Sequence, residues 1–366
     1  MIKVNSLGIM NGTSMDGVDF CLAEIELNDL YDFRFKIISE KYIPFDEGEK
    51  KMIRNALNNM GEFNLRLDDY LGKYYYKKIK KYFIDYNIDI VSIHGQTISH
   101  SSGNYSIQVG SPKYIYQELN LPVFYNFRKK DIDAGGSGAP LMPFLDWLLF
   151  KDINASTITL NIGGIANICY VPKNSIMNEV IGYDTGPGMS LIDECTKLFW
   201  NTDYDIDSVF SKKGSVNKHL LASLLNHDYL RLSAPKSTGR HEFGFSYINR
   251  ILAKHESVNK YDIIRTLVYY SAKTITDCIK QVTNDDFFNL YVNGGGKHHT
   301  LLLNDIFSML NKFNYKDLAD FNINSDFKEA LLMSVLGVAS LHGIKSNILS
   351  VTGAKFNVIC GENFNE

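Results

Sequence analysis

The middle of the chain brings together one acid and two glycine turns, residue types from which a phosphate-transfer site can be built. The β-branched run that begins at Thr157 ends in Gly163-Gly164, so a strand is predicted to stop where the backbone turns without side chains. A second run ends in Asp184 and is followed by Gly186-Pro187-Gly188 and a helical pattern. A carboxylate beside exposed amides and a helix N-terminus suits phosphate binding and proton abstraction near the phosphate.

Glycine turns of this kind also occur in proteins without a function at the turn. Either turn alone fits an ordinary loop with a helix-capping acid about equally well, because short glycine motifs often match by chance. The functional interpretation is favoured here because two further glycine loops occur in the same chain, one near each end.

The first of these loops lies between the predicted strand Val4–Met10 and an alternating run that starts at Val18. Amides and hydroxyls in this loop can wrap phosphate oxygens, and the acid Asp16 can hold a water of a Mg²⁺ shell. A tight hairpin turn favours the same residue types for conformational reasons, so this loop alone does not decide. The residues that we assign to ATP or phosphate binding here are Gly12, Thr13, Ser14, Met15, Asp16, Gly17, Val18 and Asp19.

The second loop, Gly294-Gly295-Gly296, lies between the predicted strand Asn289–Val292 and a helix. Three consecutive glycines permit a flat ring or a ribose to approach the backbone closely. We therefore assign these glycines to ATP binding as well, together with Gly163 and Gly164.

Polar residues that follow two strands of the first half are candidates for holding a second substrate. His94 and Gln96 come after the predicted strand Ile88–Ile93, at the position where open α/β sheets place ligands. A lone histidine is more often a structural hydrogen-bonding residue than a catalytic one, so only its position favours His94. Arg128 follows the predicted strand Val123–Tyr125 and could bind a carboxylate or phosphate bidentately if it points into a cleft.

The composition is that of a globular chain without the features of a nucleic-acid or membrane protein. With 366 residues, 45% hydrophobic, the chain is long enough for two domains, and a net charge of -3 provides no polycationic field. The segment Lys73–Lys81 is predicted to form a helix with one buried and one solvated lysine face, rather than an RNA-binding patch. Five cysteines without zinc-like spacing predict reduced thiols, no structural metal and a cytoplasmic protein.

Eight ordered motifs resemble the anhydro-N-acetylmuramic acid kinase family, within the actin/hsp70/sugar-kinase superfamily. The likeness runs from the first strand to Val351-Thr-Gly-Ala354 and so covers essentially the whole chain. The motifs are Gly12-Thr-Ser-Met-Asp-Gly-Val-Asp19, Ser92-Ile-His-Gly-Gln-Thr97, Phe127-Arg128 with Asp131-Ile132, Gly138-Ala-Pro-Leu141, Leu160-Asn-Ile-Gly-Gly-Ile-Ala-Asn167, Asp184-Thr-Gly-Pro-Gly188, Pro235-Lys-Ser-Thr-Gly-Arg240 and Asn293-Gly-Gly-Gly296.

Two positions depart from the family pattern. Asn126 stands where the family usually has Asp before Phe-Arg, which could alter how Arg128 is held. Lys297-His298-His299 replaces the usual Arg-Asn after the triple glycine, which could weaken contacts to adenine. Neither departure removes the acid Asp184.

The resemblance implies an α/β, two-domain actin-like ATPase/sugar-kinase fold made of duplicated ribonuclease-H-like units with an interdomain cleft. A weak internal repeat agrees with it, because the strand, glycine turn and strand at 157–171 resemble the pattern at 4–27. We expect an N-terminal domain of residues 1–131, joined by the C-terminal segment 336–366, and a C-terminal domain of residues 132–335. Such domains would close over bound substrate to exclude bulk water.

The resemblance also implies an activity, in which ATP, Mg²⁺ and water convert 1,6-anhydro-N-acetylmuramic acid to N-acetylmuramic acid 6-phosphate during cell-wall (peptidoglycan) recycling. Asp184 would be the catalytic base that deprotonates the water attacking C1. The residues expected to hold the sugar are His94, Gln96, Arg128, Asp131 and Glu329, with Arg128 as the partner of the lactyl carboxylate. A homodimer is expected, with no nucleic-acid or membrane partner.

Two alternatives of other kinds stay open at this point. One is a different sugar or small-acid kinase on the same scaffold, in which Asp184 deprotonates a substrate hydroxyl directly. The other is a nucleotide-switched binding protein of the actin/hsp70 type, since fold alone does not fix function.

Overall fold

The computed structural model describes residues 2–12, 15–58, 62–151, 153–283, 285 and 287–365. The chain groups into two compact units, each with its own sheet. Unit 1 comprises Met1–Leu149 with Phe321–Glu366, and unit 2 comprises Phe150–Asp320. The domain boundaries expected near residues 131 and 335 stay a prediction.

Unit 1 is built on a sheet in the order β12-β6-β4-β1-β2-β3, with β5 paired to β4. Strands β1, β2 and β3 are antiparallel neighbours, whereas β4 lies parallel to β1 and β6 parallel to β4. The strands are β1 (Val4–Met10), β2 (Gly17–Leu27), β3 (Phe33–Pro44), β4 (Ile90–Ser101), β5 (Tyr105–Val109), β6 (Val123–Tyr125) and β12 (Glu362–Asn363).

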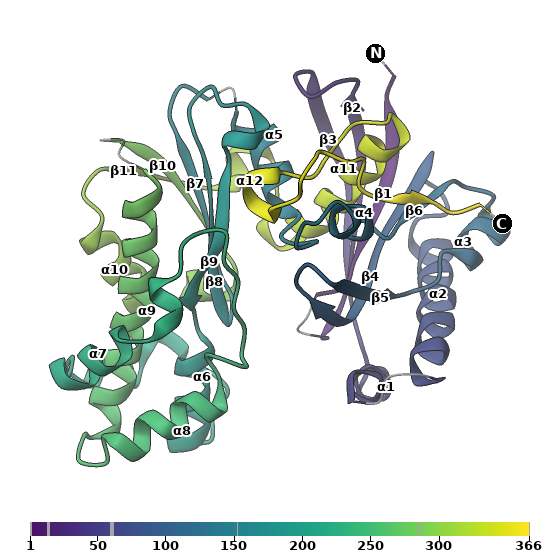
Figure 1. Cartoon of the computed structure of the whole chain (residues 1–366). Helices are drawn as coiled ribbons and strands as arrows, with labels where there is room; N and C mark the ends of the chain where they lie inside the picture. The colour runs from purple at the N-terminus through teal and green to yellow at the C-terminus, as the bar shows by residue number, and fades with distance from the viewer. Residues whose placement is uncertain are drawn as a thin grey trace. The chain divides into compact units, whose positions relative to one another are not determined.

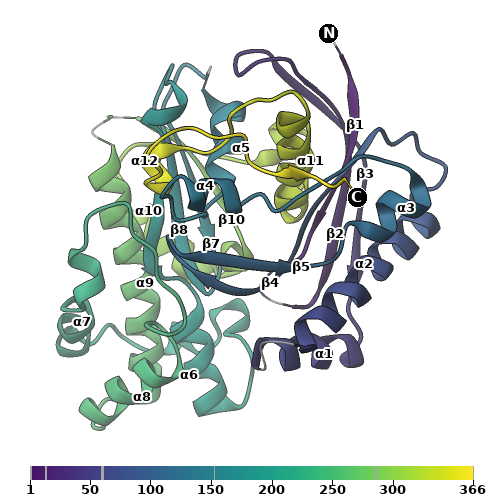
Figure 2. The same ribbon diagram turned by 45° about the vertical axis from the view of Figure 1, so that its right-hand side comes forward.

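Helices cover both faces of this sheet, as Figure 2 shows for α2 and α11. The glycines explain why α11 packs so closely: a β-carbon on Gly8 would lie 2.1 Å from the carbonyl oxygen of Ala330. The lysine-rich helix α2 buries Leu67, Leu71 and Tyr75, as its spacing predicted. The helices of unit 1 are α1 (Glu47–Asn58), α2 (Glu62–Tyr82), α3 (Lys113–Leu119), α4 (Lys129–Asp133), α5 (Met142–Phe150, ending at the boundary of unit 2), α11 (Lys328–Leu341) and α12 (Leu349–Thr352).

Unit 2 repeats this topology with a sheet in the order β11-β10-β7-β8-β9. Strands β7, β8 and β9 are antiparallel neighbours. Strand β10 lies parallel to β7, and β11 lies parallel to β10, as β4 and β6 continue the sheet of unit 1. The expected internal duplication is therefore confirmed. The strands are β7 (Thr157–Ile162), β8 (Ile165–Val171), β9 (Ile181–Pro187), β10 (Phe288–Asn293) and β11 (Phe313–Lys316).

The helices of unit 2 surround a core in which the long helix α9 packs on β8 and β9 (Figure 1). Ile264, Leu267 and Ile275 from α9 are fully buried in the same hydrophobic core as Ile158 and Leu160 of β7. The helices are α6 (Ser190–Trp200), α7 (Lys218–Leu225), α8 (Phe245–Lys254), α9 (Lys260–Val282) and α10 (Thr300–Met309), and the 3₁₀ turn η5 spans Gly295–His298.

Two expected strand ends are corrected by the structure. β4 does not stop at Ile93 but continues through His94 and Gln96 to Ser101, because its second half pairs with β5. Likewise Asp184 does not end its strand, since β9 runs on to Pro187. In both cases hydrogen-bonding partners elsewhere in the chain extend the strand past the polar residues.

The cysteines and the helices bear on two expectations from the composition, reduced thiols and the lack of a membrane-spanning segment. All five cysteines are free and buried. Within the described part of the chain, no helix is long and apolar enough to cross a membrane.

Candidate active site

Asp184 lies in the middle of β9, beside an irregularity in its pairing with β8. Asn167 faces Asp184 but Ala166 faces Gly186, so Thr185 is an extra residue on the β9 side. Such a bulge bends a strand locally and redirects its side chains. The Asp184 side chain is half-buried and lies on the strand next to the one that starts at the Gly163-Gly164 turn.

Three contacts from the loop around residues 229–238 hold Asp184 in place. Its amide donates to the Lys236 carbonyl at 3.2 Å, and its own carbonyl accepts from the Tyr229 hydroxyl at 2.6 Å. Its carboxylate oxygen Oδ2 accepts from the amide of Thr238 at 2.9 Å. The backbone is thus fixed on both sides and one carboxylate oxygen is oriented.

The environment of this carboxylate adjusts its basicity. Burial raises the pKa of Asp184 to about 6, against a smaller lowering by the hydrogen bond from Thr238. A general base works best when its pKa lies near the pH at which it operates. Asp184 therefore has the position and the pKa of a base rather than those of a helix cap.

We expect the catalytic turnover to fall as the pH drops through about 6, because Asp184 must be deprotonated to accept a proton. The pH dependence of kcat/KM measures this, with an expected tenfold loss per pH unit below the pKa. Unfolding through this group does not explain the loss, because a carboxyl with a raised pKa binds its proton more tightly in the folded chain, so its protonation favours the fold.

Asp193 has to be separated from this effect, because burial raises its pKa to about 7. The Asp193→Asn variant should keep the acidic limb near pH 6. If kcat/KM of the unchanged chain stayed constant down to pH 5, Asp184 would not be the group whose ionisation controls the rate.

The glycine turn between β7 and β8 is joined directly to the start of α6. The Gly163 carbonyl accepts from the amide of Met189 at 2.9 Å, and the Gly164 carbonyl accepts from those of Gly188 and Ser190 at 2.9 and 3.0 Å. A β-carbon on Gly188 would lie 2.4 Å from the Gly163 carbonyl oxygen, so a side chain there would break this junction. The turn and the start of the helix therefore form one rigid group.

The triple-glycine loop adopts the conformation that its sequence predicts. Gly294 has a φ of +80°, which side chains rarely tolerate, and a β-carbon on Gly296 would collide with Ile162 at 2.2 Å. At Gly295, by contrast, a β-carbon would have no atom within 4 Å. The loop is packed against β7 on one side and open at Gly295.

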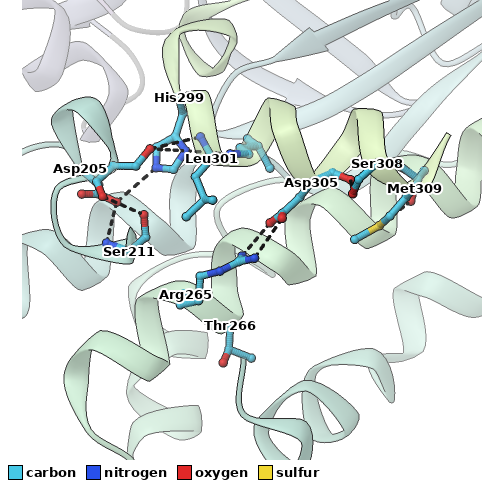
Figure 3. A network of polar contacts seen from close by, with 12 residues as sticks. Asp205, Ser211, Arg265, Thr266, His299, Leu301, Asp305, Ser308 and Met309 are labelled. Carbon is cyan, nitrogen blue, oxygen red and sulfur yellow. Dashed lines mark hydrogen bonds and ion pairs between the residues drawn. The ribbon is translucent and has the colours of Figure 1, made fainter. Parts of the chain in front are cut away.

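A buried polar network holds the helix that follows this loop (Figure 3). The ring of His299 accepts from the amide of Leu302 through Nδ1 and lies 3.2 Å from Asp205 through Nε2. Burial alone would raise the pKa of Asp205, but hydrogen bonds from His299, Ser211 and Phe210 outweigh it and lower that pKa. Further along α10, Asp305 accepts two bonds from Arg265, at 2.6 and 2.9 Å.

The ring of His299 is 4% exposed and faces Asp205, so it holds the helix in place, and weaker adenine contacts stay a prediction. We expect His299→Ala to destabilise the chain by about 1–3 kcal/mol, since Asp205 keeps a buried carboxylate with one partner fewer. The KM for ATP should rise several-fold while kcat changes less. Thermal unfolding and ATP titrations measure both, and His298→Ala, at an exposed neighbour, is the matched control.

The first glycine loop is described only in part. Thr13 and Ser14 lie outside the described residues. Gly12, Met15 and Asp16 form the connection, with the Gly12 carbonyl accepting from Gln96 Nε2 at 3.3 Å. Gly17, Val18 and Asp19 begin β2 and pair with β3, and their assignment to ATP binding stays a prediction.

Acidic side chains gather at this end of unit 1. Burial, together with the charges of Glu329, Asp16 and Asp326, raises the pKa of Asp19 to about 7. Mg²⁺ usually binds proteins through one or two carboxylates together with phosphate oxygens, so these acids suit such an ion. Among the described residues no group of three or more His, Cys, Asp or Glu side chains is arranged to hold a metal ion, and Mg²⁺ at Asp16 stays a prediction.

Arg128 is held by two contacts that leave the rest of its guanidinium for a ligand. Its Nε donates to His94 Nε2 at 3.1 Å and its Nη1 donates to the Gly138 carbonyl at 2.9 Å. Burial and the Arg128 charge lower the pKa of His94 to about 3, so the imidazole is neutral. His94 donates its Nδ1 proton to the Gly95 carbonyl, at 2.8 Å.

The five residues expected to contact the sugar therefore differ in their surroundings. His94 is occupied with Arg128 and Gly95, and Gln96 is 1% exposed beneath Gly12. Asp131 is fully buried, and its carboxylate accepts from Gly138, Asn347 and Thr352. All three hold neighbouring groups in place, and their contact with the sugar stays a prediction. Arg128 is only partly buried and Glu329, near the start of α11, is exposed, so these two are the better candidates for direct contact.

The sequence profile of the family described as anhydro-N-acetylmuramic acid kinase matches residues 4–366. The chain belongs to this family. Proteins named anhydro-N-acetylmuramic acid kinase are 37% identical in Clostridioides difficile (strain 630), with 97% of each chain covered, and 34% identical in Francisella tularensis subsp. novicida (strain U112), again with 97% of each chain covered.

Membership of the anhydro-N-acetylmuramic acid kinase family confirms the resemblance seen in the sequence. It also agrees with the α/β class and the duplicated sheets. Neither alternative function gains support from these relatives.

The structure also shows what the first family departure, Asn126, does. Asn126 has a left-handed φ of 57°, which asparagine tolerates, and its Nδ2 donates to Glu362 of β12 at 3.0 Å. An aspartate could not donate to that carboxylate. Asn126 therefore ties β6 to the chain end, while Arg128 is held by His94 and Gly138.

Sequence reasoning missed the residues that hold the base. Tyr229 and Thr238 contact Asp184 across 45 and 54 residues of chain. The segment 235–240 stood out in the sequence only as a family motif, and nothing in its residues pointed to Asp184.

Proposed function

We propose that this chain is an ATP-dependent kinase that opens 1,6-anhydro-N-acetylmuramic acid with water and phosphorylates O6, giving N-acetylmuramic acid 6-phosphate. The observation that carries this proposal is the Asp184 carboxylate, half-buried, with a pKa raised to about 6 and one oxygen fixed by the Thr238 amide. Family membership agrees with it. Such an enzyme serves the recycling of cell-wall sugars.

The reaction needs one base and one phosphate cradle. Asp184 takes a proton from the water that attacks C1, and the C1–O6 bond breaks with its electrons on O6. That oxygen bonds to the γ-phosphorus of ATP, and the bond between this phosphorus and the β,γ-bridging oxygen breaks to release ADP. Glycosidases usually supply a second carboxylic acid to protonate the leaving oxygen. Phosphoryl transfer absorbs the charge on O6 instead, so one carboxylate suffices.

The remaining residues bind and orient. We assign the phosphates to the amides around Gly163 and Gly164 and to the Gly12–Asp16 connection, because phosphoryl transfer depends mainly on positioning and electrostatics. Mg²⁺, when bound through Asp16 and Asp19, neutralises phosphate charge. Arg128 binds the lactyl carboxylate, with His94 and Gly138 holding its plane.

Isotope labelling tests the proposal directly. The chain is incubated with ATP, Mg²⁺ and anhydro-N-acetylmuramic acid in ¹⁸O-water, and the product is analysed by mass spectrometry. Heavy oxygen is expected at C1 and phosphate at O6. Phosphorylated sugar without label at C1 would favour direct deprotonation of a hydroxyl, and ATP binding without sugar-dependent turnover would favour a nucleotide-switched binding protein.

The oligomeric state and the cellular location of the protein are part of the same proposal. We expect a homodimer acting in the cytoplasm, where ATP and recycled sugars are available. Light scattering of the purified chain tests the first expectation, and cell fractionation tests the second.

A further inference from the structure

The loop from Lys236 to Arg240 contacts two parts of unit 2 that the proposed reaction has to couple. At one end, the Lys236 carbonyl and the Thr238 amide bind the backbone and the carboxylate of Asp184. At the other end, the side chain of Arg240 lies against the glycine turn. A β-carbon built on Gly164 would be 3.4 Å from Arg240 Nε and 3.5 Å from its Nη2. The guanidinium thus lies directly beside the proposed phosphate turn.

The backbone that carries Arg240 is fixed. The amides of Glu242 and Phe243 both donate to the Gly239 carbonyl at 3.0 Å, and the Phe243 side chain is fully buried. A β-carbon on Gly244 would lie 2.2 Å from the Arg240 carbonyl oxygen, so the chain folds back tightly after the arginine. This compact turn sets the point from which the long side chain reaches Gly164.

Arg240 forms an ion pair with Glu194 through Nη1, and this pair leaves Nε and Nη2, which face the glycine turn, unused. Nη1 lies 3.3 Å from Glu194 Oε1 on α6, whereas the atoms nearest to Gly164 are Nε and Nη2. The side chain of Arg240 is 59% exposed, so a ligand can reach it. An exposed pair with Glu194 contributes only about 0–1 kcal/mol to stability, which makes stability a weak reason for this arrangement.

We propose that Arg240 is a further catalytic residue, whose Nε and Nη2 donate to the γ-phosphoryl group of ATP at the Gly163-Gly164 turn. The inference rests on the proposed function. It assigns to this site a positively charged side chain for the phosphate, which the glycines themselves do not provide. A planar guanidinium matches two phosphate oxygens at once. In phosphoryl transfer the charge spreads over the equatorial oxygens, so a fixed cation there stabilises the transition state. Glu194 acts through Arg240 as a positioning residue.

Three variants test the inference. Arg240→Ala removes the guanidinium, and Arg240→Lys keeps a charge without the two-pronged geometry. Arg231→Ala is the matched control, because Arg231 is an exposed arginine of the same unit, paired with Asp228. For each variant, kcat, both KM values and the thermal midpoint are measured, with and without added guanidinium chloride at a concentration far below its denaturing range. Sodium chloride at the same concentration controls for ionic strength.

We expect Arg240→Ala to lower kcat roughly 10²–10³-fold, as the loss of one fixed donor to a reacting oxyanion does. The kcat of Arg240→Lys should be nearly as low as that of Arg240→Ala. Guanidinium should restore part of the turnover of Arg240→Ala and leave Arg231→Ala unchanged. Turnover of Arg240→Ala within threefold of the original would overturn the inference, as would a loss with a lowered thermal midpoint and no rescue by guanidinium.

A binding measurement separates this inference from the proposed function. If the original chain phosphorylates no anhydro sugar, the proposed function fails, but the contact to the γ-phosphate can still be tested without sugar. Calorimetry with a non-hydrolysable ATP analogue and with ADP should then show that Arg240→Ala weakens binding of the analogue more than that of ADP. Equal weakening of both, or of neither, would overturn the assignment of Arg240.

Discussion

Asp184→Asn is expected to abolish ring opening and phosphorylation together, lowering turnover by roughly 10²–10⁴-fold, the usual contribution of a positioned base. Asparagine has nearly the shape of aspartate and still offers an oxygen to the Thr238 amide, which lies 2.9 Å from Oδ2. The contacts that bind the Asp184 backbone to Tyr229 and Lys236 do not involve the side chain. The fold should therefore persist while the base is lost.

Product analysis by mass spectrometry checks this expectation because it follows the two bonds separately. Asp228→Asn is a suitable control, since that carboxylate is in the same unit and its side chain is 96% exposed. If the Asp184→Asn variant still opened the anhydro ring at an undiminished rate, the base would lie elsewhere and the mechanism would be wrong.

Arg128→Lys is expected to reduce kcat/KM for anhydro-N-acetylmuramic acid by roughly a hundredfold, mostly through KM, because breaking one partner of a hydrogen-bonded charge pair costs about 2–5 kcal/mol. Lysine keeps the positive charge but lacks the fork that binds a carboxylate with two parallel bonds. It also cannot donate to His94 and Gly138 in the way that Arg128 does.

A substrate without the lactyl group distinguishes recognition from a general loss of structure. The anhydro form of N-acetylglucosamine lacks the carboxylate, so Arg128→Lys should affect its turnover far less. An equal loss on both sugars would show that Arg128 only supports the fold. Arg34→Lys, at an exposed arginine of unit 1, controls for the substitution itself.

The two units divide the tasks in these predictions. The proposals assign to unit 2 the base Asp184, the Gly163-Gly164 turn and Arg240, which one loop and one helix N-terminus link. They assign to unit 1 the sugar partner Arg128. Variants in unit 2 should therefore change kcat most, and variants around Arg128 should change the KM for the sugar.

Local sequence was sufficient for several parts of the site. The alternation around Val18 and the β-branched run from Thr157 predicted strands that the structure contains, and Gly163-Gly164 falls at the turn between β7 and β8 as expected. The conformation of Gly294 follows from the same kind of reasoning. These features depend on the steric properties of neighbouring residues, which a sequence displays directly.

Other roles depended on partners far away in the chain. Asp131 is a buried positioning residue because Asn347 and Thr352, 216 and 221 residues later, donate to its carboxylate. His299, which stood out in the sequence only as part of a departure from the family pattern, is the partner of Asp205, 94 residues earlier. Neither pairing leaves a periodic or local signal.

By itself, the sequence determined the family, the duplicated α/β plan, the glycine turns and the choice of Asp184 as the acid beside one of them. Only the tertiary structure decided that Asp184 lies within a strand at a bulge, that Tyr229 and Thr238 hold it, and that Arg240 reaches Gly164. The physical reason is that turns and periodicity are properties of adjacent residues. Burial, pKa and hydrogen-bond partners depend instead on which distant segments the fold packs together.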